Sequence, residues 1–153
     1  MKTVLVTALL SAACIAVAAA PAAPLAAEQP AAAAAQLAIR FEGIEAPTGQ
    51  IMLSVYDNAA AHDGNGRPVR VAMVPVAGSA ATARFEGLAP GDYAVKAFHD
   101  VDGDGKMGTN PFGMPIEPYA FSNNARPEGA PPRWEAARFA VAAGENTVSI
   151  TIK

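Results

Sequence analysis

Three aspartates alternate with other residues in one short stretch, where Asp100, Asp102 and Asp104 precede Gly105. Side chains at alternate positions of a tight loop can turn their carboxylates toward one centre, and carboxylate oxygens are the ligands that calcium prefers. The glycine supplies the sharp turn, and the backbone carbonyl of Lys106 is the next oxygen in this pattern. The sequence therefore predicts a calcium-binding loop that opens at Asp100.

The end of this loop departs from the usual pattern. Its last position is Pro111, which cannot supply the bidentate carboxylate that normally closes the site. Glu117 and the amide oxygen of Asn110 are the candidates to replace it. With so few carboxylates we expect weak binding, on the order of 10⁻⁴ to 10⁻³ M. The alternative is a loop without metal, in which aspartates and glycines only form turns.

The elements that position this loop are strands. After residue 36, apolar and polar residues alternate with period two in several short segments, which is typical of half-buried strands. We count about seven such segments by this criterion, beginning near residues 37, 51, 69, 81, 92, 137 and 147. The turn residues Pro47 and Gly49 between the first two predict a hairpin. In the third, Val69, Val71 and Met73 define one face, and Pro75 restricts that strand to a sheet edge or an early end.

No segment of convincing length shows a helical period, and strands without intervening helices favour an antiparallel sandwich. The strand segment that ends at Gly87 is followed by a Pro-Gly turn and then by Tyr93. This arrangement matches the tyrosine corner of immunoglobulin-like and transthyretin-like sandwiches, in which the phenol bonds the backbone across the corner. The predicted fold is therefore an all-β, immunoglobulin-like or transthyretin-like antiparallel β-sandwich with one long loop.

That loop covers residues 99–133, which show no strand alternation. A loop of this length in a compact domain is usually functional or disordered. Phe112, Tyr119 and Phe121 are apolar anchors that disordered segments tend to lack, so we expect an ordered loop packed over one end of the sandwich. His99, at its start, is expected to have a structural role.

The loop also contains groups that suit a glycan or peptide ligand. Aromatic faces beside amide groups are typical of such sites, and the candidates are Tyr119, Phe121, Asn123, Asn124 and Trp134. The alternative is that Phe112, Phe121 and Trp134 fasten the loop to the core. In that case the two asparagines are turn residues.

Residues 1–20 carry one basic residue, Lys2, before a short apolar run that ends in small residues, the pattern of a secretory signal peptide. The run is too short and alanine-rich for a good membrane span, which needs ~20 strongly apolar residues. We expect cleavage there or as far downstream as Ala27. A flexible Ala/Pro-rich spacer over residues 21–35 and a sandwich domain over 36–153 would follow. The protein is therefore expected to be periplasmic or secreted.

Composition narrows the chemistry. The only cysteine, Cys14, lies in the signal segment, and no G-x-S-x-G motif is present, so acyl transfer has little support. HDGNG, at residues 62–66, has one carboxylate and is interpreted as a turn. A net charge of −3 without a basic block argues against nucleic acid. The sequence thus predicts a non-catalytic binding or envelope-associated module. The alternatives are a structural domain without metal and a hydrolase that uses Glu117 and an aspartate on glycans.

The central motifs occur in a characteristic order. The acidic run is followed by Asn110, then by FGMPIE ending at Glu117, YAFSNN ending at Asn124 and PPRW ending at Trp134. This order resembles a family of small secreted bacterial proteins catalogued as domain of unknown function 2141, and the resemblance extends over about residues 36–153. It implies an exported immunoglobulin-like or transthyretin-like sandwich with no established activity. The family often has an acidic residue where this chain has Gly108, so this loop has one carboxylate fewer.

Overall fold

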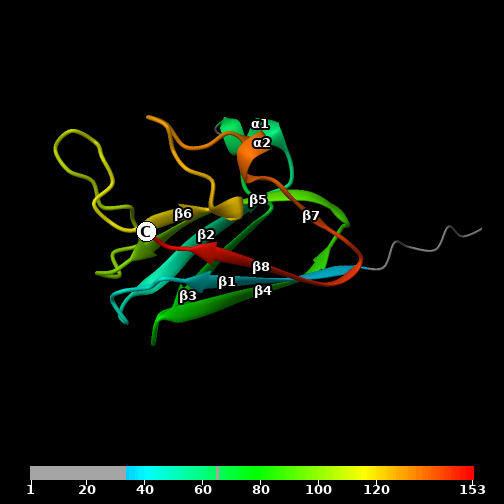
Figure 1. Cartoon of the computed structure of the whole chain (residues 1–153), viewed down its shortest axis with the longest axis horizontal. Helices are drawn as coiled ribbons and strands as arrows, with labels where there is room; N and C mark the ends of the chain where they lie inside the picture. Colours follow the sequence, from blue (N-terminus) through cyan, green and yellow to red (C-terminus); the bar gives the residue numbers. More distant parts are fainter. Residues whose placement is uncertain (1–33, 65) are drawn as a thin grey trace, which may run out of the picture.

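Two β-sheets pack face to face in the computed structural model, which describes residues 34–64 and 66–153 (Figure 1). One sheet has the strand order β4-β1-β8, and the other has β3-β2-β5-β6, with β7 also paired to β5. The strands are β1 (Ala35–Glu42), β2 (Gln50–Tyr56), β3 (Arg70–Pro75), β4 (Ala80–Leu88), β5 (Gly91–Asp100), β6 (Tyr119–Phe121), β7 (Phe139–Val141) and β8 (Gly144–Thr151). The predicted β-sandwich is confirmed, with eight strands rather than seven. The predicted signal peptide lies outside the described residues.

The order of the strands corrects the predicted first hairpin. β1 pairs with β4 and β8, whereas β2 pairs with β3 and β5, so the first two strands belong to different sheets. Alternation reports that one face of a strand is buried, but it does not report which strand lies beside it. Residues 43–49, with their turn residues, therefore carry the chain across the sandwich. The pairing of β1 with β8 is parallel, whereas the other ladders between the described strands are antiparallel.

The core lies between the sheets and is built from alternate residues of the long strands. Each strand contributes the side chains on its inner face, as period-two alternation requires. The largest fully buried apolar side chains are Leu37, Ile39, Phe41, Ile51, Val55, Val95 and Ile150. The tyrosine corner is also confirmed, because the Tyr93 hydroxyl donates a hydrogen bond of 2.7 Å to the carbonyl oxygen of Ala89.

β3 is an edge strand and ends at Pro75, as the proline predicted. The face assigned to it was wrong. Val71 and Met73 are 68% and 64% exposed, and Ala72 and Val74 are the residues that pack against the core. A shift of one residue exchanges the two faces of a strand. Because the outer face of β3 is also apolar, the difference between apolar and polar positions does not identify its buried face.

The long loop after β5 is ordered and contains structure of its own. β6 pairs with β5 and is followed by the 3₁₀ turn η1 (Ser122–Asn124), and the helix α2 (Trp134–Ala137) lies beside α1 (Ala59–Asp63) (Figure 1). β6 is the strand that alternation missed, because three residues are too few to show a period. Phe112 is not an anchor, since it is 89% exposed at the tip of the preceding turn.

Candidate functional site

The acidic loop is organised around the carboxylate of Asp100, which is buried at the end of β5. Its Oδ1 accepts hydrogen bonds from the backbone N–H groups of Gly103 and Asp104, at 2.8 and 3.1 Å. Its Oδ2 accepts from the backbone of Gly105 at 3.0 Å and from the amide of Gln50 at 2.9 Å. The Gln50 bond, with these backbone bonds, lowers the pKa of the Asp100 carboxyl. The loop therefore winds around an ionised carboxylate.

Glu117 returns to this loop from the far side of the following turn. Its Oε1 accepts the N–H of Val101 at 2.9 Å, and its Oε2 accepts that of Gly108 at 2.8 Å. Carboxylate oxygens of Asp100, Asp102 and Glu117 all lie within 4.8 Å of one another. Glu117 thus closes the loop from a position beyond the twelve residues of the usual calcium-binding loop.

The remaining predicted ligands lie outside this group of three carboxylates. Asp104 and Lys106 are exposed, and the Asp104 Oδ1 accepts the Lys106 N–H at 2.8 Å. The Oδ1 of Asn110 accepts the N–H groups of Phe112 and Met114, at 2.9 and 3.0 Å, and so holds the turn that follows. The amide oxygen of Asn110 therefore stabilises that turn.

The donor set of the loop fits a hard cation only loosely. Three close carboxylates supply the oxygen ligands that calcium accepts. However, a carboxylate has about four lone-pair sites, and four N–H groups already donate to the carboxylate of Asp100. These N–H groups also offset part of the negative charge that a cation would neutralise. The arrangement is therefore that of a hydrogen-bonded turn that brings three carboxylates close together.

His99, next to Asp100, is buried and has a structural role, as its position at the strand end predicted. Its Nε2 lies 2.7 Å from the carbonyl oxygen of Thr48, and its backbone N–H donates to Pro118 at 2.8 Å. These contacts tie the end of β5 to the segments on either side. His99 thereby holds the start and the end of the acidic loop together.

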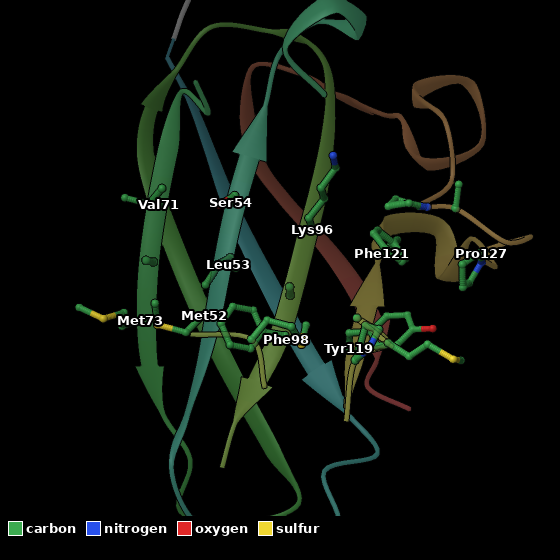
Figure 2. A pocket seen from close by; sticks show the side chains of 18 of the residues that line it. Met52, Leu53, Ser54, Val71, Met73, Lys96, Phe98, Tyr119, Phe121 and Pro127 are labelled. Atoms are coloured by element: carbon green, nitrogen blue, oxygen red, sulfur yellow. The ribbon is translucent and has the colours of Figure 1, made fainter. Parts of the chain in front are cut away.

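Two of the predicted ligand-contacting residues lie on one surface. Tyr119 and Phe121, both on β6, line an apolar groove on the outer face of the larger sheet, and their rings meet edge to face at 5.8 Å between centroids (Figure 2). The other three are committed elsewhere. Asn123 and Asn124 bond the backbone at Arg138 and Thr151 from left-handed turn positions, at 2.6 and 2.8 Å.

Trp134 is buried in a small cluster of its own, against Ala94 and Ala137. It forms part of the contact between α2 and β5 and is not a surface ring. The alternative in which Trp134 fastens the loop to the core is the one that the structure supports. The predicted platform of aromatic and amide groups is therefore reduced to Tyr119 and Phe121.

The apolar groove of about 1060 Å³ was not predicted from the sequence. Its floor includes the outer face of β2, β3 and β5 (Figure 2). Its walls come from the long loop, at residues 107–115 and 127–131. The lining includes Met52, Met73, Met107, Met114, Val71, Phe98, Tyr119, Phe121 and Lys96. The sequence signal for the groove was that β2 and β3 have apolar residues on both faces. An antiparallel sheet with one solvated face normally has polar residues on its outer face.

A second feature that sequence analysis missed is a buried histidine in α1. The predicted turn at residues 62–66 begins with the last residues of this helix, His62 and Asp63. The His62 Nδ1 lies 2.8 Å from the Asp63 Oδ1, which also accepts the backbone N–H of Trp134 at 2.7 Å. Burial lowers the pKa of His62, and its Nε2 has no hydrogen-bond partner within the described part of the chain. The imidazole is therefore a neutral packing group between the rings of Tyr56 and Trp134.

The fold and the loop together define the class of the protein: a small all-β sandwich with a carboxylate-lined turn at one end of a strand. The family model described as "Uncharacterized protein conserved in bacteria (DUF2141)" matches residues 39–149, and the chain belongs to this family. The family indicated by the central motifs is thus confirmed. Neither a curated protein nor a solved structure matches the chain. Among the described residues, no helix is long and apolar enough to cross a membrane.

Proposed function

We propose that this protein is an exported, non-catalytic binding module whose groove takes an apolar ligand and whose acidic loop binds calcium weakly. The observation that carries the proposal is the groove itself. Val71, Met73 and Met114 are each more than 60% exposed in its lining. Contiguous apolar surface of this kind marks binding sites in soluble proteins, and a volume of about 1060 Å³ is at the upper end of ligand pockets.

The acidic loop is connected to the groove through the chain. The carboxylates of Asp100 and Asp102 precede Met107, and Met107 begins the wall that continues to Pro115. Glu117 fixes the other end of this wall through its bond to Gly108. A cation held between these carboxylates would restrain both ends of the wall. Calcium is proposed because oxygen ligands suit it and because an expected affinity on the order of 10⁻⁴ to 10⁻³ M suits an extracellular compartment.

The non-catalytic part of the proposal has support in the two histidines. His62 and His99 are both buried, and one ring nitrogen of each is bonded to a protein oxygen. The carboxylates accept backbone N–H bonds and lie together in one loop, whereas a glycosidase needs two that face each other across a substrate. Export is proposed from the signal-like segment at residues 1–20.

The experiment is the binding of a neutral, environment-sensitive dye such as Nile red to the purified protein, with EDTA and with about 10 mM calcium, a concentration above the expected dissociation constant. The dye should bind in the groove, and its affinity should rise with calcium. Met73→Ser should weaken binding, because Met73 lines the groove and its exposure makes the change mild for folding.

Phe112→Ser is the matched control. Phe112 is more exposed than Met73 but lies outside the groove lining, so its loss should leave dye binding unchanged. Equal effects of the two substitutions would mean that the dye reports general surface hydrophobicity, and the groove would not be the site. An affinity that is the same in EDTA and in calcium would leave the groove as the site and refute the connection to the loop.

A further inference from the structure

Two rows of outward-facing side chains cross the floor of the groove. The first is apolar throughout and contains Met73, Met52, Phe98 and Tyr119, which are neighbours on successive strands. The second row, displaced by two residues on each strand, contains Val71, Ser54, Lys96 and Phe121. At about 4.8 Å between strands, each row is about 14 Å long. An extended alkyl chain of about ten carbons fits within that length, given carbon–carbon bonds of about 1.5 Å.

Among the described residues that line the groove, Lys96 is the only charged one. Its ammonium lies toward the α1 end of the groove, where it donates a hydrogen bond to the carbonyl oxygen of His62 and lies 5.1 Å from the centroid of the Tyr56 ring (Figure 2). An ammonium has three donors, so two remain after the His62 bond.

No carboxylate of the described residues forms an ion pair with Lys96. The pKa of Lys96 is lowered, mainly by burial, and the nearby acid Asp63 offsets only part of this effect. The Oδ1 of Asp63 is bonded to His62 and to the backbone of Trp134. A partly desolvated cation beside an apolar surface gains most from an anionic partner that also excludes water.

We propose that the ligand of the groove is a single-chain anionic amphiphile, a long-chain carboxylate, whose alkyl chain lies on the apolar part of the groove floor and whose carboxylate pairs with the Lys96 ammonium at the α1 end. This proposal rests on the proposed function, because it names the ligand class of the same groove. Flexible methionines suit such a chain, since they adapt to an alkyl ligand without a fixed shape. The described residues include four methionines, Met52, Met73, Met107 and Met114, and all four line the groove.

The test uses these methionines as reporters. The full chain is labelled with ¹³C in the methionine methyl groups and titrated at pH 7 with decanoate, decanol and decyltrimethylammonium, each below its micelle concentration. The three probes share a chain and differ in the charge of the head. Decanoate should shift the groove methionines and bind at least about tenfold more tightly than decanol, which corresponds to about 1.4 kcal/mol. The cationic probe should bind most weakly.

Two variants at Lys96 separate charge from shape. Lys96→Met keeps the aliphatic stem and removes the charge, so decanoate should lose its tenfold advantage while decanol binds as before. Lys96→Arg keeps the charge and should keep the preference for decanoate over decanol. This variant also tests the proposal if Lys96→Met folds poorly through loss of the His62 bond. Undiminished decanoate binding by folded Lys96→Met, or equally tight binding of the cationic probe, would overturn this proposal and leave the apolar groove intact. Absence of methionine shifts with all three probes would overturn the proposed function as well.

Discussion

Replacing Gly108 with aspartate should destabilise the metal-free protein and strengthen its response to calcium. A Cβ at this position would lie 3.5 Å from the Oε2 of Glu117, so a new carboxylate would enter the existing acidic group. Two unit charges about 4 Å apart repel by about 1 kcal/mol in water and about 4 kcal/mol at an effective dielectric constant of 20. Because Gly108 and Glu117 are only half-buried and Asp102 is exposed, the repulsion lies nearer the lower value. We expect a loss of about 1 kcal/mol without metal.

Calcium should reverse this loss. At ten times the dissociation constant a ligand stabilises the folded state by about 1.4 kcal/mol, and at a hundred times by about 2.7 kcal/mol. If the fourth carboxylate tightens binding about tenfold, the calcium-dependent gain rises by about 1.3 kcal/mol. The two effects have opposite signs, so the order of the variants should change between EDTA and about 10 mM calcium.

The assay is thermal unfolding of Gly108→Asp and Gly108→Asn in each buffer. Asparagine has nearly the same shape and shares the cost of a Cβ placed 3.2 Å from the Cγ1 of Ile116, but it has no charge. The aspartate variant should melt lower than the asparagine variant in EDTA by roughly 3 to 6 °C, the shift expected for about 1 kcal/mol in a domain of this size. It should melt at the same temperature or higher in calcium. Identical curves in EDTA would show that position 108 does not face the other carboxylates, and an aspartate variant without a calcium response would refute the calcium site.

Three further predictions concern the scaffold. Tyr93→Phe removes the bond to the exposed Ala89 carbonyl and should cost about 0.5 to 1.5 kcal/mol in urea unfolding; no loss would mean that the tyrosine corner is not stabilising. Ser122→Ala should lower the free energy of unfolding by more than Tyr93→Phe, about 1 to 3 kcal/mol, because the buried Ser122 hydroxyl accepts the Val95 N–H at 2.8 Å. A loss equal to or smaller than that of Tyr93→Phe would contradict this pairing. The pKa of His62 is lowered in the folded state, so the unfolded state binds more protons below about pH 6.5. The free energy of unfolding should therefore fall as the pH is lowered from about 6.5 through the folded-state pKa. In His62→Phe this part of the pH dependence should disappear, as measured by urea midpoints across that range, and an unchanged profile would assign it to another group.

The parts of the fold that the sequence predicts are those in which one residue type has one structural consequence. The alternation in β8, the edge position before Pro75 and the corner at Tyr93 were each predicted and are each present. Strand partners were not predictable in the same way, because pairing depends on contacts far apart in the chain. The apolar outer face of β3 explains why its buried face was predicted wrongly, because Val71 and Met73 have the spacing of core residues but are exposed.

The candidate site was predictable in part for a similar reason. The spacing of the aspartates placed Asp100 and Asp102 in one turn, and Glu117 was named as the residue that could return to it. The role of Asn110 in the next turn depends on backbone geometry that residue spacing does not report. The apolar outer faces of β2 and β3 were the one sequence signal of the groove, but its walls form only where the long loop passes beside that sheet face.

The parallel pairing of β1 with β8 has a consequence for the order of folding. β1 is the central strand of its sheet, and its register with β8 runs from Ala35 opposite Gly144 to Glu42 opposite Thr151. Contacts between distant parts of a chain form slowly, and β8 is synthesised after the other described strands. One edge of β1 therefore stays open until almost the whole domain has been made. The chain can pair β2 with β3 and β5 before β8 is present, but the smaller sheet, and with it the closed core, needs β8.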